Sequence, residues 1–134
     1  MSGARYLLDT HILVWAMSAP ERLSAAARAA LTDEDNELAY STLAFFEAGI
    51  KQSIHPKVRL FDFATIEADC ERAGLARLDV RAAHAAVSAT LPFHHRDPFD
   101  RMLVAQASAE GMRLLTADGR LASYGAVVAF VGPA

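Results

Sequence analysis

The chain has 134 residues, 53% of them hydrophobic and 22% charged, which is enough for one compact core and too few for two ordinary domains. Residues 1–134 are therefore expected to form a single domain, and the one cysteine, Cys70, excludes an internal disulfide and a zinc cage built from cysteines. The formal net charge of −3 argues against the broad basic surface of proteins that grip nucleic acid mainly through its phosphates.

Neither a secretory signal nor a membrane span is expected. Tyr6 to Leu8 are followed at once by Asp9, so the N-terminal residues lack the long apolar core of a signal sequence. The longest apolar stretch elsewhere, Ile12 to Met17, is far too short to cross a bilayer. Together with the single cysteine, these features predict a soluble cytoplasmic protein with no membrane partner.

Short apolar segments alternate with helical patterns along the chain. Strands are expected at residues 5–8, 37–40, 75–80, 112–116 and 127–131. Helices are expected at residues 11–17, 20–30, 41 or 42 to a break at 55–57, 62–73, 81–91 and 97–110. This alternation is typical of a parallel sheet covered by helices on both faces, so the fold class is predicted to be α/β.

The helix boundaries follow from cap and break residues. Thr10 is expected to cap the first helix, and Pro20 to open the second. Asp97 is expected to be the N-cap of the helix that starts at Pro98, and Gly111 to lie just past its end.

Four acidic residues stand where a plain core would carry another residue type. Asp9 and Asp118 each follow the tip of a predicted strand, Glu47 interrupts the apolar face of its helix, and Asp100 lies in the first turn of its helix. In open α/β sheets, sites form beyond the carboxyl ends of the strands, where Asp9 and Asp118 fall. We expect the four carboxylates to converge in one pocket.

Converging carboxylates predict a metal site. Without a matching number of lysines and arginines they repel one another, and a divalent cation relieves that repulsion. Carboxylate oxygens favour Mg²⁺ or Mn²⁺, and such an ion can activate water and polarise a phosphoryl oxygen. The set therefore predicts phosphodiester hydrolysis, in which Asp9 and Asp100 hold the metal while Glu47 and Asp118 complete its shell or orient the water.

Each acid also has an ordinary structural interpretation. Asp9 can end a strand and start a turn, as Asp118 can. Glu47 can be a surface residue paired with Lys51, and Asp100 can complete a capping box at the start of its helix. These interpretations stay open residue by residue, although all four holding together is less convincing than one shared site.

Neighbouring residues are expected to support the acids. Hydrogen bonds to the acids are expected from Thr10, Ser41 and Thr116. Contacts with RNA phosphates or unpaired bases are a further hypothesis for His94, His95, Arg96 and Arg101, for which a plain surface position is the commoner role. Trp15 is expected in the core or at an interface rather than as a platform for base stacking.

Four segments match a known family in order and spacing. They are YLLDTH at 6–11, STLAFFEAGIK at 41–51, HRDPFDRMLVAQ at 95–106 and LLTAD at 114–118. Together they resemble the PIN domain, and closely the VapC-type ribonuclease toxins of type II toxin–antitoxin systems. The resemblance covers essentially the whole chain, and its most specific part is residues 97–106.

This resemblance implies three α/β/α layers with a parallel sheet of about five strands, endoribonuclease activity dependent on Mg²⁺ or Mn²⁺, and frequent homodimers. It places the acidic site on Asp9, Glu47, Asp100 and Asp118. It also implies a cognate VapB-like antitoxin whose C-terminal segment blocks or disturbs the metal site. Residues 12–17 would suit contacts with such a partner or a place in the core, and both stay open.

Two other functions compete with this one. A receiver-like phosphoacceptor domain is also α/β with an acidic metal pocket, but it needs a lysine near the end of a late strand, whereas the two lysines here are Lys51 and Lys57. A non-catalytic interaction protein with the PIN fold is the other alternative. Its biological effect would survive Asp100→Asn.

Overall fold

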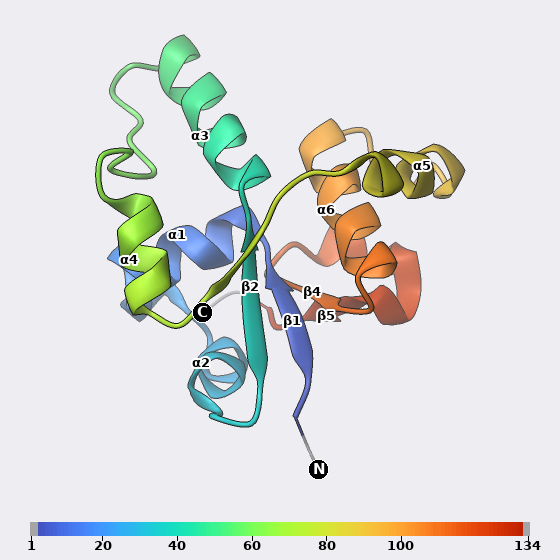
Figure 1. Ribbon diagram of the computed structural model, residues 1–134, viewed down its shortest axis with the longest axis horizontal. Coiled ribbons are helices and arrows are strands. Elements are labelled where there is room, and N and C mark those ends of the chain that lie inside the picture. The colour runs from blue at the N-terminus through green and yellow to red at the C-terminus, as the bar shows by residue number, and fades with distance from the viewer. Residues whose placement is uncertain (1–2, 133–134) are drawn as a thin grey trace.

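The computed structural model describes residues 3–132, in which five parallel strands form a sheet between helices (Figure 1). The strands are β1 (Arg5–Leu8), β2 (Glu37–Ser41), β3 (Ala76–Leu78), β4 (Arg113–Thr116) and β5 (Val128–Phe130). Their order across the sheet is β3-β2-β1-β4-β5, and every neighbouring pair is parallel. The predicted α/β class with a parallel central sheet of about five strands is confirmed.

Six α-helices connect and cover these strands within the described residues. They are α1 (Thr10–Ser18), α2 (Ala25–Thr32), α3 (Leu43–Ile54), α4 (Ile66–Arg72), α5 (Ala82–Thr90) and α6 (Pro98–Ala109). Two 3-10 segments, η1 (Pro20–Arg22) and η2 (Gly119–Val127), complete the set. No helix in this part of the chain has both the length and the apolar character needed to cross a membrane.

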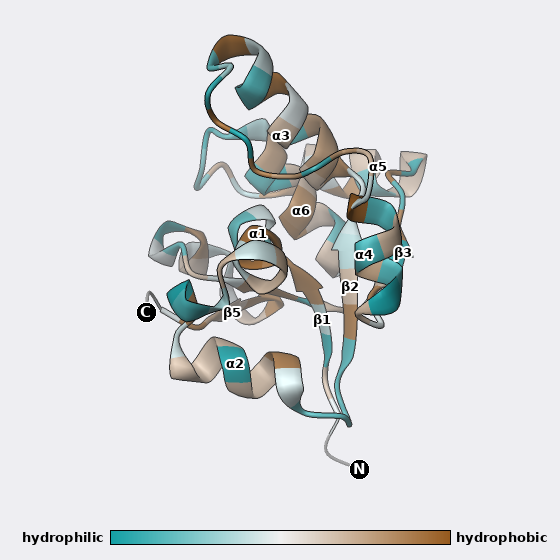
Figure 2. Cartoon of the chain, turned by 90° about the vertical axis from the view of Figure 1, so that its left-hand side faces the viewer, coloured by the Kyte–Doolittle hydropathy of each residue, from teal (hydrophilic) through white to brown (hydrophobic). Residues whose placement is uncertain are grey.

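The sheet has an apolar core on each face because neighbouring strand residues point to opposite sides. Leu8 and Leu115 belong to the cluster that packs under α1, α2 and α4, whereas Leu7 and Leu114 belong to the cluster under α6. Figure 2 shows hydrophobic residues along β1 and β2 and on α6, and also at the far end of α3. Helices therefore cover both faces, as the strand pattern predicts.

Two helix predictions are wrong at their starts. The helix expected at 20–30 is divided into η1 and α2, because Leu23 has an extended backbone and the Ser24 hydroxyl then caps α2 by accepting the N–H of Ala27. The helix expected from Asp62 begins only at Ile66, after a turn in which the Asp62 carboxylate accepts the N–H of Ala64. In both places a side-chain cap competes with helix extension.

The carboxyl ends of β1 and β4 lie side by side because these strands are neighbours in the parallel sheet. The N–H of Asp9 donates to the carbonyl of Leu115 at 3.0 Å, which extends this pairing past the end of β1. Asp9 is also the N-cap of α1 and accepts the N–H of His11, so the prediction that Thr10 is the cap is wrong. This edge of the sheet positions the acidic residues.

Candidate active site

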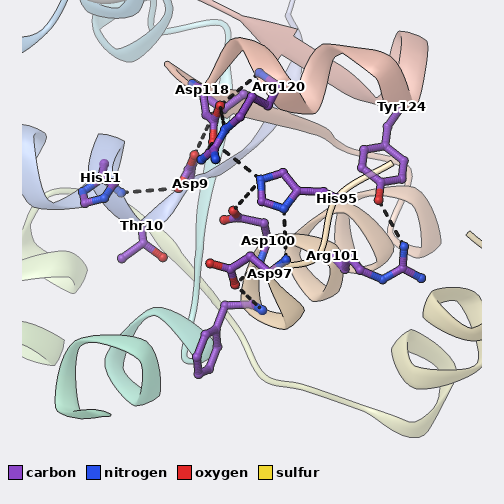
Figure 3. A network of polar contacts seen from close by, with 12 residues as sticks. Asp9, Thr10, His11, His95, Asp97, Asp100, Arg101, Asp118, Arg120 and Tyr124 are labelled. Atoms are coloured by element: carbon purple, nitrogen blue, oxygen red, sulfur yellow. Dashed lines mark hydrogen bonds and ion pairs between the residues drawn. The ribbon is translucent and has the colours of Figure 1, made fainter. Parts of the chain in front are cut away.

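The four predicted acids come from four separate places in the chain. Asp9 follows β1, Asp118 follows β4, Glu47 lies in α3, and Asp100 lies in the first turn of α6. Asp9 and Glu47 are buried, with 5% and 4% of their surface exposed, and the other two are half-buried. The negative charges of Asp9, Glu47 and Asp118 all act on the Asp100 carboxyl. Figure 3 shows Asp9, Asp100 and Asp118 around the ring of His95.

Asp9 is positioned by a hydrogen bond from a buried hydroxyl. Thr116, at the end of β4, donates a hydrogen bond from Oγ1 to Asp9 Oδ2. Burial raises the pKa of Asp9, and the hydrogen bond from Thr116 opposes that effect in part. Thr116 also accepts the N–H of Asp118 at 3.0 Å, so one side chain links two of the acids.

Glu47 is fixed by a hydroxyl and an ammonium group. Thr10 donates to Oε1 at 2.8 Å, and Lys51, one helical turn further along α3, donates to Oε2 at 2.9 Å. The pairing with Lys51 considered from the sequence is therefore present. The surface position proposed in that interpretation is wrong, because Glu47 is buried.

Asp118 has its own cation, which sequence reasoning did not identify. The Arg120 guanidinium donates to both carboxylate oxygens, at 3.0 and 2.8 Å. This interaction lowers the pKa of Asp118. Arg120 lies only two residues away, so its spacing was the signal that could have revealed the pair.

Asp100 faces the cluster and, like Asp9, has no lysine or arginine partner in the described residues. Burial raises its pKa to about 7, and the charges of Asp9, Asp97, Glu47 and Asp118 add to this effect. The capping-box alternative is wrong, because the N–H of Asp97 donates to His95 and not to the Asp100 carboxylate. Asp97 itself is the N-cap of α6, as predicted.

His95 points its ring into the acids, although the sequence suggested a place for it against RNA. Its Nδ1 accepts the N–H of Asp97 at 3.0 Å, which places the proton of the neutral ring on Nε2. Nε2 lies 3.5 Å from Asp100 Oδ2 and 3.9 Å from Asp118 Oδ2, is buried, and has no hydrogen-bond partner within residues 3–132. The imidazole is therefore a donor aimed at two carboxylates, as Figure 3 shows.

This proton position affects how the site could hold a metal. Ligand atoms of His95, Asp100 and Asp118 all lie within 4.8 Å of one another, a spacing at which three groups can share one ion. A neutral imidazole binds a metal through its unprotonated nitrogen. Because Nδ1 already accepts a backbone N–H and Nε2 carries the proton, His95 is disfavoured as a ligand and the carboxylates remain as the donor set.

The remaining predicted residues lie around this cluster. The hydroxyl of Ser41 accepts the N–H of Leu43 at 3.1 Å and makes no hydrogen bond to the four acids within residues 3–132, so the prediction that Ser41 supports the acids directly is wrong. Arg101 donates to the carbonyls of Ser88 and Pro92 and to the Tyr124 hydroxyl, so its guanidinium is engaged within the protein. The two other basic residues of the connector are exposed, with the ring of His94 5.0 Å from that of Tyr124 and the side chain of Arg96 at the surface.

The charge balance of the cluster fits a divalent cation. Glu47 and Asp118 already have a cation each, which corrects the expectation that the acids lack lysine and arginine partners. Asp9 and Asp100 have neither, and the pKa of each is raised by burial. A hard divalent ion bound by these two carboxylates would relieve that destabilisation with the oxygen ligands it prefers.

A protein-family model matches most of the chain. A model of the PIN domain matches residues 6–127, which include all four acids. The chain belongs to the PIN domain family. This PIN domain is also 32% identical over 119 residues to Ribonuclease VapC22 of Mycobacterium tuberculosis, a match that covers 88% of this chain and 90% of that protein. The predicted family is confirmed, and the receiver-like alternative is wrong.

Solved structures with the same fold include VapBC toxin–antitoxin proteins. The PIN domain matches VapBC2 of Rickettsia felis, bound to a DNA fragment from its promoter, with a TM-score of 0.68 and 16% identity over 97% of this chain and 99% of that one. It matches VapBC-5 of Mycobacterium tuberculosis with a TM-score of 0.59 and 19% identity over 96% and 98% of the two chains. At these identities the likeness establishes the fold alone.

Proposed function

We propose that this PIN domain is a divalent-metal-dependent endoribonuclease that hydrolyses RNA phosphodiester bonds at Asp9, Glu47, Asp100 and Asp118, and that it is the toxin of a toxin–antitoxin pair in the cytoplasm. The observation that carries the proposal is the convergence of four carboxylates of which two have no cation. The similarity to Ribonuclease VapC22 supports the choice of RNA as substrate.

Asp9 and Asp100 would hold a Mg²⁺ or Mn²⁺ ion, with Glu47 and Asp118 completing its surroundings. When bound, such an ion lowers the pKa of a coordinated water and polarises a phosphoryl oxygen. With a pKa of about 7, the Asp100 carboxyl is protonated in about half of the molecules at neutral pH, and a bound cation would favour its ionised form. Cation binding is therefore coupled to proton release at Asp100.

The surrounding side chains keep the carboxylates in place during the reaction. Thr116 and Thr10 direct one oxygen each of Asp9 and Glu47, so little reorganisation is needed when substrate binds. His95 supplies an N–H between Asp100 and Asp118 that can donate to whichever carboxylate oxygen is left free of the ion. His95 acts through these acids and so is a positioning residue.

The proposal is tested by cleavage of RNA with purified protein. We expect cutting with Mg²⁺ or Mn²⁺, none in excess chelator, and a loss beyond detection in Asp9→Asn and Asp100→Asn. Glu21→Gln, an exposed acid of η1, is the matched control and should cut like wild type. Cleavage that persists in chelator, or in Asp100→Asn, would contradict the metal site.

Sequencing of RNA ends after induction in cells identifies the target in the same comparison. New 5′ or 3′ ends should accumulate with the wild-type chain and not with Asp100→Asn. Growth should slow only with the wild type. If both chains slow growth equally and no new ends arise, the chain is instead a non-catalytic interaction protein with the PIN fold.

The toxin role requires a VapB-like antitoxin, and homodimers are part of the same proposal. Residues 12–17 are largely core, since Ile12, Leu13 and Val14 are buried. Several exposed apolar side chains lie instead on α3, among them Phe46 and Ile54, which are 67% and 65% exposed. Phe46→Glu should weaken co-purification with the protein encoded beside this chain, while Gln52→Glu on the same helix should not.

A further inference from the structure

A hollow opens directly beside two of the acids. Its volume is about 300 Å³, and it is lined by Asp9, His11, Trp15, Ala117, Asp118 and Gly119. Asp9 and Asp118 form the part that adjoins the acidic cluster, and the two ring-bearing residues of α1 form another part. The hollow is therefore continuous with the site at which we propose that a phosphodiester is cut.

The two rings form a stacked pair. His11 lies in the first turn of α1 and Trp15 one turn later, so both project from the same face of the helix. Their centroids are 5.9 Å apart and their planes differ by 24°. His11 is exposed and Trp15 half-buried at the edge of the core, so the pair offers flat aromatic surface to the hollow.

The composition of the hollow suits a flat, uncharged ring. The carboxylates of Asp9 and Asp118 disfavour an anionic group there unless a cation is bound. Ala117 and Gly119 add little side-chain bulk on the side contributed by the segment after β4. The Arg22 guanidinium lies 5.2 Å from the centroid of the Trp15 ring and provides positive charge for a neighbouring phosphate.

We propose that this hollow receives an unpaired nucleobase of the RNA strand, from a nucleotide next to the phosphodiester that is cut. The inference rests on the proposed nuclease function and adds the place at which a base of the substrate binds. A base inside a duplex is paired and stacked on its neighbours, whereas an unpaired base can turn out and stack on aromatic side chains. The hollow has the size of the smaller ligand sites in proteins.

Binding of mononucleotides tests the hollow without any cleavage. Trp15 is the only tryptophan of the chain, so intrinsic tryptophan fluorescence reports on this position alone. With Mg²⁺ present, adenosine and cytidine 5′-monophosphates should change the emission of the wild-type protein in a saturable way. Ribose 5-phosphate, which carries the same phosphate without a base, should not. Equal responses to all three compounds would overturn the proposal.

Cleavage kinetics provide the second test. The substrate is a single-stranded RNA with one abasic residue, placed in turn on either side of the cut bond. At one of these positions KM should rise about tenfold or more, the effect of losing one base–aromatic stack. His11→Ala and Trp15→Leu should raise KM for the intact RNA to a similar extent, yet respond little to the abasic residue, because both changes remove the same contact.

Matched variants separate this role from a structural one. Trp15→Phe keeps an aromatic ring and should retain most of the binding. His55→Ala removes an exposed histidine at the end of α3 and should behave like wild type. If wild type cuts abasic and intact RNA equally well at both positions, the base site is wrong while the nuclease stands. If wild type cuts no RNA, the nuclease is wrong, and the mononucleotide titration alone decides whether the hollow binds bases.

Discussion

Two histidines of this PIN domain, His84 and His95, make the same contact through Nδ1 but differ in the contact that Nε2 makes with a carboxylate. In each, Nδ1 accepts a backbone N–H, from Arg81 at 2.9 Å for His84 and from Asp97 at 3.0 Å for His95. In each, Nε2 faces a carboxylate. His84 meets Glu110 at 2.8 Å, whereas His95 lies 3.5 Å from the nearest oxygen of Asp100 and has no hydrogen bond through Nε2 within residues 3–132.

The charges around the two carboxylates explain the difference. Glu110 also accepts from the Arg81 guanidinium at 3.3 Å, and the hydrogen bond from His84 lowers its pKa. Asp100 has no guanidinium and is surrounded by other acids, so its pKa is raised. The histidine beside Glu110 thus joins two helices where charge is balanced, whereas the histidine beside Asp100 faces an acidic cluster where negative charge is in excess.

The largest expected effect that separates the two histidines is on cleavage. His95→Asn removes the donor at Nε2 and should lower kcat roughly 10–100-fold, the usual effect of losing a partner of metal-binding groups. His95→Gln should recover most of the activity, because its amide N–H₂ reaches about the same place. His84→Asn serves as the matched control and should keep wild-type activity per folded molecule. Equal activity of His95→Asn and wild type would remove His95 from the mechanism.

Long-range ¹H–¹⁵N NMR of the ring nitrogens checks the same assignment in the unmodified protein. Neutral His84 and His95 should both carry the proton on Nε2, because a backbone N–H occupies Nδ1 in each. A proton on Nδ1 of His95 would free Nε2 to bind metal. That result would make His95 a ligand beside Asp100 and Asp118.

For the melting temperature we expect the reverse order, with the larger effect in His84→Asn. His84 is fully buried and bonded to Glu110, so His84→Asn should lower the melting temperature by roughly 5 °C or more. His95→Asn should lower it much less, because Nε2 of His95 makes no hydrogen bond in the described part of the chain. Thermal unfolding followed by circular dichroism measures both. A larger loss in His95→Asn would mean that its contact with the acids is a structural one.

Asp100→Asn should stabilise the metal-free protein at alkaline pH. The pKa of this carboxyl is about 7 in the folded chain against an ordinary value of 3.8, so the folded state holds the proton more tightly. Stability from this group is therefore full below pH 3.8 and is lost as pH rises through 7. The variant should melt higher than wild type at pH 8 in chelator, and the difference should shrink toward pH 4. Added Mn²⁺ should raise the melting temperature of wild type only.

The smallest expected effect is at Arg120. Its side chain is 75% exposed, and exposed ion pairs add little to stability even when both carboxylate oxygens are engaged. Arg120→Gln should change the melting temperature by less than about 3 °C. If Arg120→Gln lowered the melting temperature as much as His84→Asn does, this exposed ion pair with Asp118 would stabilise the fold as strongly as the buried His84–Glu110 hydrogen bond.

Much of the fold could be predicted because its signals are local. The strands before Asp9 and Asp118 are apolar runs with clear ends, and Asp97 and Pro98 mark the start of α6. The starts of α2 and α4 could not be placed in the same way. Ser24 and Asp62 each offer the backbone a side-chain hydrogen bond in place of another helical turn, and pattern alone does not decide which is preferred.

The amino-acid sequence by itself determined that the strands would be parallel and that acids would follow two of them, because both properties depend on residue type and order. Only the tertiary structure decided that Asp9 and Asp100 are desolvated beside other acids, and that His11 and Trp15 adjoin Asp9 and Asp118. Burial and the contacts between these segments depend on residues distant in the chain, and they exist only once β1, β4, α1 and α6 are packed together.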